Sequence, residues 1–284
     1  MTGGIEIIRR RADLRNCIQN WRADGLGIGL VPTMGALHDG HFSLVEKSLA
    51  PMDRTCVTLF VNPKQFAPGD DLDVYPRDEA ADAAALAERG VDLLYAPNID
   101  EMYAPGSASI VSVPGIGDIL EGEYRPGFFT GVATVVTKLL LQSLPDRAYF
   151  GDKDYQQLCV IRRMVEDLNI PVDIEGCPIV READGLALSS RNAYLGEDER
   201  KIAPCLYQSL QEVAGRITAG ERIENVLIDV KDGLLKSGFT KVDYVSVCHS
   251  ETLTPLSTLQ GRARILAAAS LGKTRLIDNI GVND

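Results

Sequence analysis

The chain has 284 residues, 45% of them hydrophobic, and a formal net charge of −11. This length and composition are those of a folded globular protein with one large or two ordinary domains, and the acidic balance argues against a nucleic-acid backbone as the main partner. The six cysteines make no CxxC pair, so a zinc or redox motif is not expected. No apolar run approaches the roughly 20 residues that span a membrane, and no apolar segment follows the basic N-terminus. We therefore expect a cytoplasmic protein without a signal peptide or a membrane partner.

Apolar residues recur at helical or strand-like spacing along the first half of the chain. The helical spacing predicts helices over residues 5–21, 42–49 and 78–89. Short apolar or β-branched runs predict strands over residues 27–32, 54–61 and 92–95. Residues 115–129 are rich in glycine and are expected to form a long loop, and residues 131–142 are expected to form a buried helix in spite of their β-branched residues.

The alternation continues with a strand over 147–150, a helix over 155–168 and a strand over 172–180. Strands that alternate with helices predict an α/β fold, with a Rossmann-like, doubly wound parallel sheet. After about Cys177 the pattern changes, because helical segments over 198–219 and 224–236 precede strand-like runs over 242–248 and 264–269. We therefore expect one domain over residues 1–177 and a smaller α+β domain over residues 178–284.

Two of the three histidines lie in the stretch VPTMGALHDGH, residues 31–41, directly after a predicted strand. Ligands of a doubly wound sheet bind at the carboxyl ends of its strands, and the start of the next helix offers free N–H groups to a phosphate. Gly35 would let the backbone turn there, and His38 and His41 could donate hydrogen bonds to a phosphoryl group whose charge grows during a reaction. The alternatives are ordinary loop histidines or part of a metal site, for which the sequence suggests no third cysteine or histidine ligand.

Two later stretches could also bind phosphate. Lys153 follows a predicted strand in GDKD and could reach a phosphate as a point charge; otherwise it is an ordinary surface lysine. In LSSRN, the side chains of Ser189, Ser190 and Arg191 could wrap polyphosphate oxygens, or the stretch could be a turn that caps a helix.

Gln65 and Gln157 each follow the end of a predicted strand. An amide both donates and accepts hydrogen bonds, which suits a substrate that carries a carboxylate and hydroxyls, although an exposed glutamine is the ordinary alternative. The sequence contains no G-x-S-x-G elbow and no reactive-cysteine motif. Catalysis here would therefore depend on positioning and charge stabilisation and would not need a covalent nucleophile.

The stretch HDGH resembles the HIGH-type signature of adenylylating nucleotidyltransferases, a group that includes class I aminoacyl-tRNA synthetases. The longer string PTMGALHDGH is more selective and resembles the pantothenate synthetase family, the pantoate–β-alanine ligases. Further stretches agree with this family, in order, over nearly the whole chain: FVNPKQF, DLDVYPRD, GDKDYQQL, DGLALSSRN and RLIDN.

The resemblance implies an N-terminal domain that binds nucleotide and pantoate, and a C-terminal domain that closes over ATP as a lid, with LSSRN as a mobile loop. It implies ATP-dependent condensation of pantoate with β-alanine to pantothenate, through a pantoyl adenylate, with release of pyrophosphate and AMP. ATP and Mg²⁺ are the implied cofactors, pantoate and β-alanine the small-molecule partners, and a homodimer the implied assembly.

The family's functional residues carry over to matching positions of this sequence. The resemblance implies four catalytic side chains: His38, His41, Lys153 and Arg191. It places the nucleotide against these four and against Met34, Gly35, Gly151, Asp154, Val180, Leu188, Ser189 and Ser190. It places pantoate against Met34, Asn62, Gln65 and Gln157, with Gln65 also near β-alanine.

Two places depart from the family pattern. The usual RPGHF is RPGFF here, so Phe128 takes the place of a histidine, and any polar role of that position is lost or handled otherwise. The acidic cluster that would help to hold Mg²⁺ is thin, and Asp82, flanked by Ala81 and Ala85, is its remaining metal candidate. A magnesium ion carried mainly by the ATP phosphates needs few protein ligands in any case.

Two rival functions share some of these motifs. A nucleotidyltransferase of the same fold would contain HDGH and keep the adenylyl group on its product instead of releasing AMP. A non-catalytic nucleotide-binding regulator would bind ATP without turning it over. The presence of both GDKD and LSSRN argues against the regulator, because a sensor needs no second phosphate-binding stretch.

Overall fold

The computed structural model describes residues 4–67, 72–73 and 75–283. The predicted motif DLDVYPRD lies partly outside these ranges, because Asp71 and Val74 are not among the described residues. The chain divides into two compact units, one formed by the residues up to 152 together with 160–178, and one formed by 153–159 together with 179–284.

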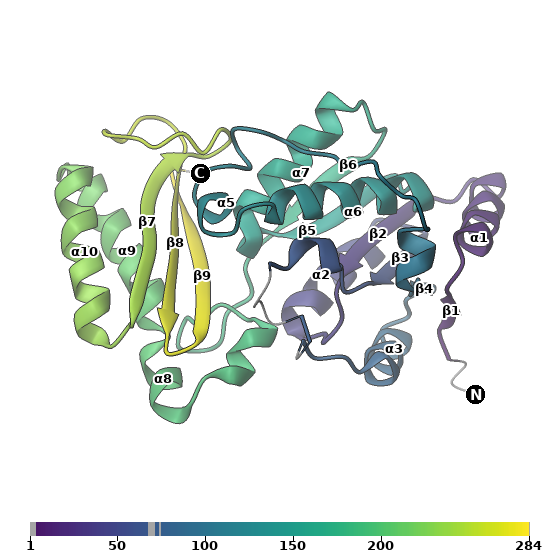
Figure 1. The fold of residues 1–284 in the computed structure, drawn as a ribbon, viewed down its shortest axis with the longest axis horizontal. Coiled ribbons are helices and arrows are strands. Elements are labelled where there is room, and N and C mark those ends of the chain that lie inside the picture. The colour runs from purple at the N-terminus through teal and green to yellow at the C-terminus, as the bar shows by residue number, and fades with distance from the viewer. Residues whose placement is uncertain (1–3, 68–71, 74, 284) are drawn as a thin grey trace. The chain divides into compact units, whose positions relative to one another are not determined.

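The first unit contains a parallel sheet of six strands within the described residues (Figure 1). Its strand order is β1-β4-β3-β2-β5-β6, and every neighbouring pair is parallel. The strands are β1 (Glu6–Ile8), β2 (Ile28–Thr33), β3 (Arg54–Leu59), β4 (Leu93–Tyr95), β5 (Arg147–Gly151) and β6 (Asp173–Cys177). This topology confirms the predicted Rossmann-like sheet.

Helices cover both faces of this sheet. The helices of this unit are α1 (Arg11–Ala23), α2 (Asp39–Leu49), α3 (Glu79–Glu88), α4 (Ile99–Met102), α5 (Glu121–Tyr124), α6 (Phe128–Ser143) and the part of α7 (Tyr155–Asp167) from residue 160 onward, with a 3₁₀ turn η1 (Pro63–Gln65). The turn η2 (Asp152–Asp154) leads from Asp152 of this unit into residues 153–159 of the second. Leu44 of α2 and Leu86 of α3 pack with Val31 and Val57 of the central strands in one buried cluster. Figure 1 draws α6 on the opposite side of the strands from α2.

Two expectations for this unit differ from the structure. The helix predicted over 5–21 begins only at Arg11, because Glu6–Ile8 pairs with β4 as the edge strand of the sheet. Three residues are too few to show a strand period, so the pairing decides their conformation. The loop predicted over 115–129 contains the short helix α5 and the start of α6, which follows Gly127 in a left-handed conformation with φ +83°.

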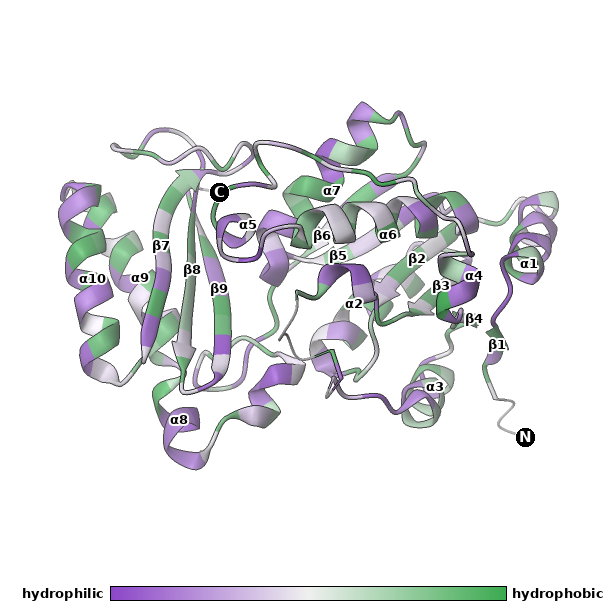
Figure 2. Cartoon of the chain, viewed as in Figure 1, coloured by the Kyte–Doolittle hydropathy of each residue, from purple (hydrophilic) through white to green (hydrophobic). Residues whose placement is uncertain are grey.

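The second unit packs helices against an antiparallel sheet with strand order β7-β8-β9. Its elements are η3 (Ser190–Tyr194), α8 (Glu197–Ile202), α9 (Cys205–Thr218), α10 (Ile223–Ser237), β7 (Lys241–His249), β8 (Ala263–Leu271) and β9 (Thr274–Val282). Figure 2 shows both hydrophobic and hydrophilic residues on α9 and α10, and their apolar faces join the strands in one buried core. This unit confirms the predicted α+β composition.

The helix predicted over 198–219 is two helices, because Pro204 lacks the N–H that a continuous helix would need and stands at the N-cap of α9. Strand β9 is absent from the sequence-based expectations, where its stretch appears only as the motif RLIDN. Its Asp278 and Asn279 are nearly fully buried, so the polar–apolar alternation of a half-exposed strand is missing. Among the described residues, no helix combines the length and apolarity needed to span a bilayer.

Candidate functional site

A sharp turn joins the end of β2 to α2 and carries the two predicted histidines. Gly35 has φ +87° and Ala36 has φ +52°, so two successive residues are left-handed. A Cβ at position 35 would lie 3.1 Å from Asp82 Oδ2, so both the conformation and the available space favour glycine. The backbone then enters α2, with His38 at the N-cap.

The two histidines lie at the start of α2, with His38 at the N-cap and His41 in the first turn. His38 Nδ1 accepts a hydrogen bond from the backbone N–H of Gly40 at 3.1 Å, and His41 Nδ1 accepts one from the N–H of His38 at 3.4 Å. The ring centroids are 4.2 Å apart. A neutral imidazole whose Nδ1 accepts carries its proton on Nε2, so this hydrogen-bond pattern assigns both histidines the Nε2–H tautomer. Each ring is then a hydrogen-bond donor held by its own backbone.

Asp82 of α3 braces the same turn. Its Oδ2 accepts a hydrogen bond from Ala36 N and its Oδ1 accepts one from Leu37 N, each at 2.9 Å. The residue is 6% exposed. Burial raises the pKa of this carboxyl above its ordinary value, against the opposing effect of the two N–H donors.

The surroundings of Asp82 differ from those of a metal ligand. Both of its oxygens face backbone N–H groups, and the described part of the chain contains no group of three histidine, cysteine or acidic side chains that could hold an ion. Magnesium prefers several oxygen ligands in near-octahedral geometry. Within the described residues, the surroundings of Asp82 therefore do not fit a magnesium site built by protein side chains, and the assignment of Asp82 as a metal ligand stays a prediction.

Three residues predicted to bind pantoate meet beyond the ends of β2 and β3. Asn62 Nδ2 donates to Gln65 Oε1 at 3.0 Å, and Gln65 Nε2 lies 3.0 Å from the Met34 sulfur. Asn62 is 1% exposed and Gln65 8%. A thioether is a weak acceptor, so the Gln65 N–H donor is held in place by a partner that a carboxylate or hydroxyl oxygen could readily replace.

Two residues that the sequence analysis missed support this group. Tyr103 donates a hydrogen bond to Asn62 Oδ1 at 2.9 Å, and burial raises the pKa of its phenol to about 12, so it remains a donor at neutral pH. The carbonyl of Gly131 accepts from Asn62 Nδ2 at 3.1 Å. A Cβ at position 131 would overlap the carbonyl oxygen of Lys64, so glycine lets α6 approach η1 closely. A lone glycine inside a helical run was the available signal for this close approach.

Phe128 stands where the family pattern has histidine. Its ring lies 3.9 Å from the guanidinium carbon of Arg125, within cation–π distance. Arg125 also donates to the backbone carbonyl of Gln65 at 3.3 Å. The aromatic face thus contacts the arginine that reaches η1, and an ionisable imidazole is absent from this position.

Gly151 ends β5 in the first unit, and the remaining predicted residues belong to the second unit. Lys153 and Asp154 form η2, and Gln157 lies in the first turn of α7; all three are half-buried. The backbone carbonyl of Lys153 accepts a hydrogen bond from Asn279 Nδ2 at 3.0 Å. In the sequence, Asn279 is part of a motif but has no assigned role.

The stretch around LSSRN begins with a short hairpin. Val180 O accepts from Leu188 N at 3.0 Å, which brings these two predicted residues side by side. Ser189 is the N-cap of η3, and its Oγ accepts from Arg191 N at 3.3 Å. The capped turn that the sequence allowed is therefore present, and Ser190 and Arg191 form its first residues.

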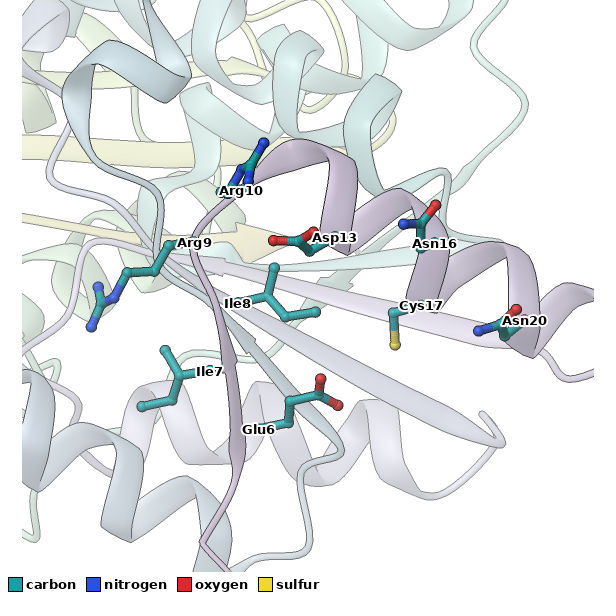
Figure 3. Close-up of a pocket in the computed structure, with 9 residues that line it drawn as sticks. All are labelled: Glu6, Ile7, Ile8, Arg9, Arg10, Asp13, Asn16, Cys17 and Asn20. Carbon is teal, nitrogen blue, oxygen red and sulfur yellow. The ribbon is translucent and has the colours of Figure 1, made fainter.

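Figure 3 shows a pocket elsewhere in the first unit, between β1 and one side of α1. It has a volume of about 670 Å³ and is lined by nine residues between Glu6 and Asn20. Its lining mixes Glu6 and Asp13 with Arg9 and Arg10, and it contains none of the predicted site residues.

Comparison with known proteins gives consistent matches. A family model described as pantoate–β-alanine ligase matches residues 6–281. The chain is 55% identical to a pantothenate synthetase of Paramagnetospirillum magneticum, covering 99% of both chains, and 52% identical to one of Chelativorans sp., covering 98% of both.

Solved structures agree with these matches. A pantothenate synthetase from Thermus thermophilus aligns with TM-score 0.92 and 46% identity, covering 97% of this chain and 99% of that one. A pantoate–β-alanine ligase from Francisella tularensis, complexed with β-γ ATP and β-alanine, aligns with TM-score 0.81 and 36% identity, covering 97% of each chain.

Proposed function

Because this chain belongs to the pantoate–β-alanine ligase family and is a ligase of that kind, we propose that it makes pantothenate in two steps through a pantoyl adenylate. The pantoate carboxylate attacks the α-phosphorus of Mg-ATP, and pyrophosphate leaves. The amine of β-alanine then attacks the acyl carbon, loses a proton and displaces AMP. Adenylation supplies a good leaving group, which a carboxylate lacks. The complex of the Francisella tularensis relative with an ATP compound and β-alanine supports these ligands.

The hydrogen bonds of the two imidazoles are the observation that supports the proposal most. Because His38 Nδ1 and His41 Nδ1 both accept backbone N–H groups, their Nε2–H groups serve as donors. Two such donors at a helix N-terminus stabilise negative charge that develops on the phosphates as pyrophosphate departs. They are fixed before substrate binds, so little reorganisation is needed in the transition state.

The buried amide group recognises pantoate in this proposal. Gln65 Nε2 turns from the weak Met34 sulfur to a pantoate oxygen, while Asn62 donates to Gln65 Oε1 and is itself held by the hydroxyl of Tyr103. Gln157 adds a second amide. The buried polar groups reject an analogue that cannot supply the matching oxygens, because they would be left without partners.

Residues from 151 onward supply the rest of the nucleotide site in this proposal. Lys153 and Arg191 neutralise the triphosphate in this proposal. The lysine ammonium acts as a compact positive charge, and the planar guanidinium can donate two parallel hydrogen bonds to phosphate oxygens. Backbone and hydroxyl groups complete the site, from Gly151, Asp154, Val180, Leu188, Ser189 and Ser190. Magnesium enters as part of the substrate Mg-ATP. The domain boundaries at 177 and 178, the lid role of the C-terminal domain, the homodimer and the cytoplasmic location stay predictions.

Exchange of labelled pyrophosphate into ATP, with and without pantoate, tests the proposal. We expect exchange that requires pantoate and does not require β-alanine, followed by formation of AMP and pantothenate once β-alanine is added. Production of ADP would contradict the adenylate. An adenylyl group retained on the product would indicate a nucleotidyltransferase instead, and ATP binding without any exchange would indicate a regulator.

A further inference from the structure

We propose that Asp82 is a positioning residue whose carboxylate holds the turn at residues 35–37 and thereby sets the orientation of His38 and His41. The role of the histidines rests on the proposed function, whereas the contact of Asp82 with the turn is a property of the fold. Asp82 lies on α3 and shapes the reaction without contacting the substrate.

The backbone conformation of the turn at residues 35–37 needs stabilising contacts. Gly35 and Ala36 both have positive φ, at +87° and +52°, and an alanine in the left-handed region is unfavourable unless its surroundings hold it there. A strand–helix turn also exposes N–H groups that need acceptors once they are buried. The two carboxylate oxygens of Asp82 accept from the N–H groups of Ala36 and Leu37, one each.

Two hydrogen bonds from successive N–H groups to one carboxylate fix direction as well as distance. The carboxylate itself is held near the start of α3 and is almost inaccessible to solvent. Its Oδ2 also lies where a side chain at position 35 would have to go. The turn is therefore clamped from α3 against the ends of the central strands.

The two hydrogen bonds from Ala36 and Leu37 to Asp82 lie next to the predicted catalytic groups in the chain. His38 directly follows Leu37, caps α2 with its ring and donates its backbone N–H to His41. A rotation of the peptide units at 36 and 37 would turn both imidazoles together. Displacement of a catalytic group by about 1 Å can cost on the order of 100-fold in rate. Loss of the Asp82 carboxylate is therefore expected to lower turnover even though both histidines are still present.

Asp82→Ala and Asp82→Asn, with Asp78→Ala as the matched control, test this role. Asp78 is the N-cap of the same helix, and its carboxylate accepts a hydrogen bond from Ala81 N at 3.0 Å, a backbone group of α3 and not of the turn at residues 35–37. All variants are checked by circular dichroism and thermal melting, then assayed for pantoate-dependent pyrophosphate exchange. We expect Asp82→Ala to lower kcat about 10- to 100-fold with a smaller change in KM for ATP. The kcat of Asp82→Asn should lie between those of Asp82→Ala and the wild-type enzyme, and the kcat of Asp78→Ala should stay within about twofold of wild type.

A double-mutant cycle with His41→Ala separates positioning from a general loss of structure. If Asp82 acts through the histidines, Asp82→Ala should cost a smaller factor in rate in the His41→Ala background than in the wild-type enzyme, because only His38 is then left to be misplaced. Independent, multiplicative losses would overturn the proposal, as would wild-type turnover by Asp82→Asn and Asp82→Ala. An Asp82→Asn protein that does not fold would assign the carboxylate to the fold as a whole and would also overturn it.

The same cycle separates a failure of the positioning role of Asp82 from a failure of the proposed function. If His41→Ala turns over normally, the proposed function of the histidine pair fails. If His41→Ala is impaired while both Asp82 variants are not, only the positioning role fails.

Discussion

The side-chain amide of Asn279 donates a hydrogen bond of 3.0 Å to the backbone carbonyl of Lys153, a residue 126 positions earlier in the chain. Asn279 Oδ1 in turn accepts from Arg264 Nε at 2.8 Å, and the guanidinium of Arg264 lies 4.1 Å from the centroid of the Tyr155 ring. Asn279 is 2% exposed. Strands β8 and β9 therefore hold the backbone of η2, the turn that carries the predicted phosphate-binding lysine.

We expect Asn279→Ala to lower kcat by about tenfold, because the Lys153 backbone loses the donor that places it. Loss of a buried hydrogen-bond partner should also cost about 1–3 kcal/mol in the free energy of unfolding. Steady-state AMP release, measured well below the melting temperature, gives the first quantity, and urea denaturation gives the second. Asn283→Ala is the control, since its amide makes a long, exposed bond of 3.5 Å to Gly261 O. Equal kcat for the two variants would show that Lys153 does not depend on Asn279.

The histidine pair offers a direct test of charge stabilisation. We expect His41→Ala to fold and to lose about 10²–10³ in the rate of adenylation, as for loss of one donor to a developing anion. The third histidine supplies the control: His249 Nδ1 accepts from Glu251 N at the end of β7, and His249→Ala should keep wild-type turnover. Pantoate-dependent pyrophosphate exchange measures both. A His41→Ala enzyme as active as the control would remove the imidazole from the mechanism.

Gly131 provides a test of the close approach between α6 and η1. A methyl group at this position would overlap the backbone of Lys64 and Gln65, so Gly131→Ala should push η1 away. We expect a raised KM for pantoate and a loss of about 1–3 kcal/mol in stability from overpacking. A Cβ added at Gly215 of α9 would meet no atom within 4 Å, so Gly215→Ala should instead gain up to about 1 kcal/mol from helix propensity. Two variants of equal stability and equal KM would contradict this account.

Asp243 links pH to the stability of the second unit. Burial raises the pKa of its carboxyl, but the ion pair with Lys241 and the hydrogen bond from Arg275 Nε, 2.7 Å each, outweigh burial and leave the pKa below its ordinary value of 3.8. A lowered pKa in the folded state stabilises the fold above the unfolded pKa, and this contribution is lost as pH falls through the folded pKa.

Asp243→Asn should therefore lower the free energy of unfolding by about 1–3 kcal/mol at pH 7. The difference from wild type should shrink steadily below pH 3.8, the ordinary pKa of the carboxyl. Denaturant titrations of both proteins at several pH values measure this difference. A gap that stays constant down to the acid limit would mean that the charge of Asp243 contributes nothing.

Local pattern determined much of this protein's architecture. Apolar runs at 27–32 and 54–61 predicted β2 and β3 because buried parallel strands need continuous apolar sequence. The stretch PTMGALHDGH indicated a turn at the end of a strand and the start of a helix, since glycine and N-capping residues act within a few positions of the chain. These features depend on neighbours in sequence, which is why the family could be recognised from motifs alone.

Contacts between distant segments were decided only in the tertiary structure. The sequence marks Asp82 as a metal candidate, and its two bonds to the turn at 36 and 37 become visible only when α3 packs beside α2. Tyr103 and Asn279 bear no motif that marks them as partners of Asn62 and Lys153. A hydrogen bond between residues far apart in the chain leaves no period or spacing in the sequence, because folding alone brings its donor and acceptor together.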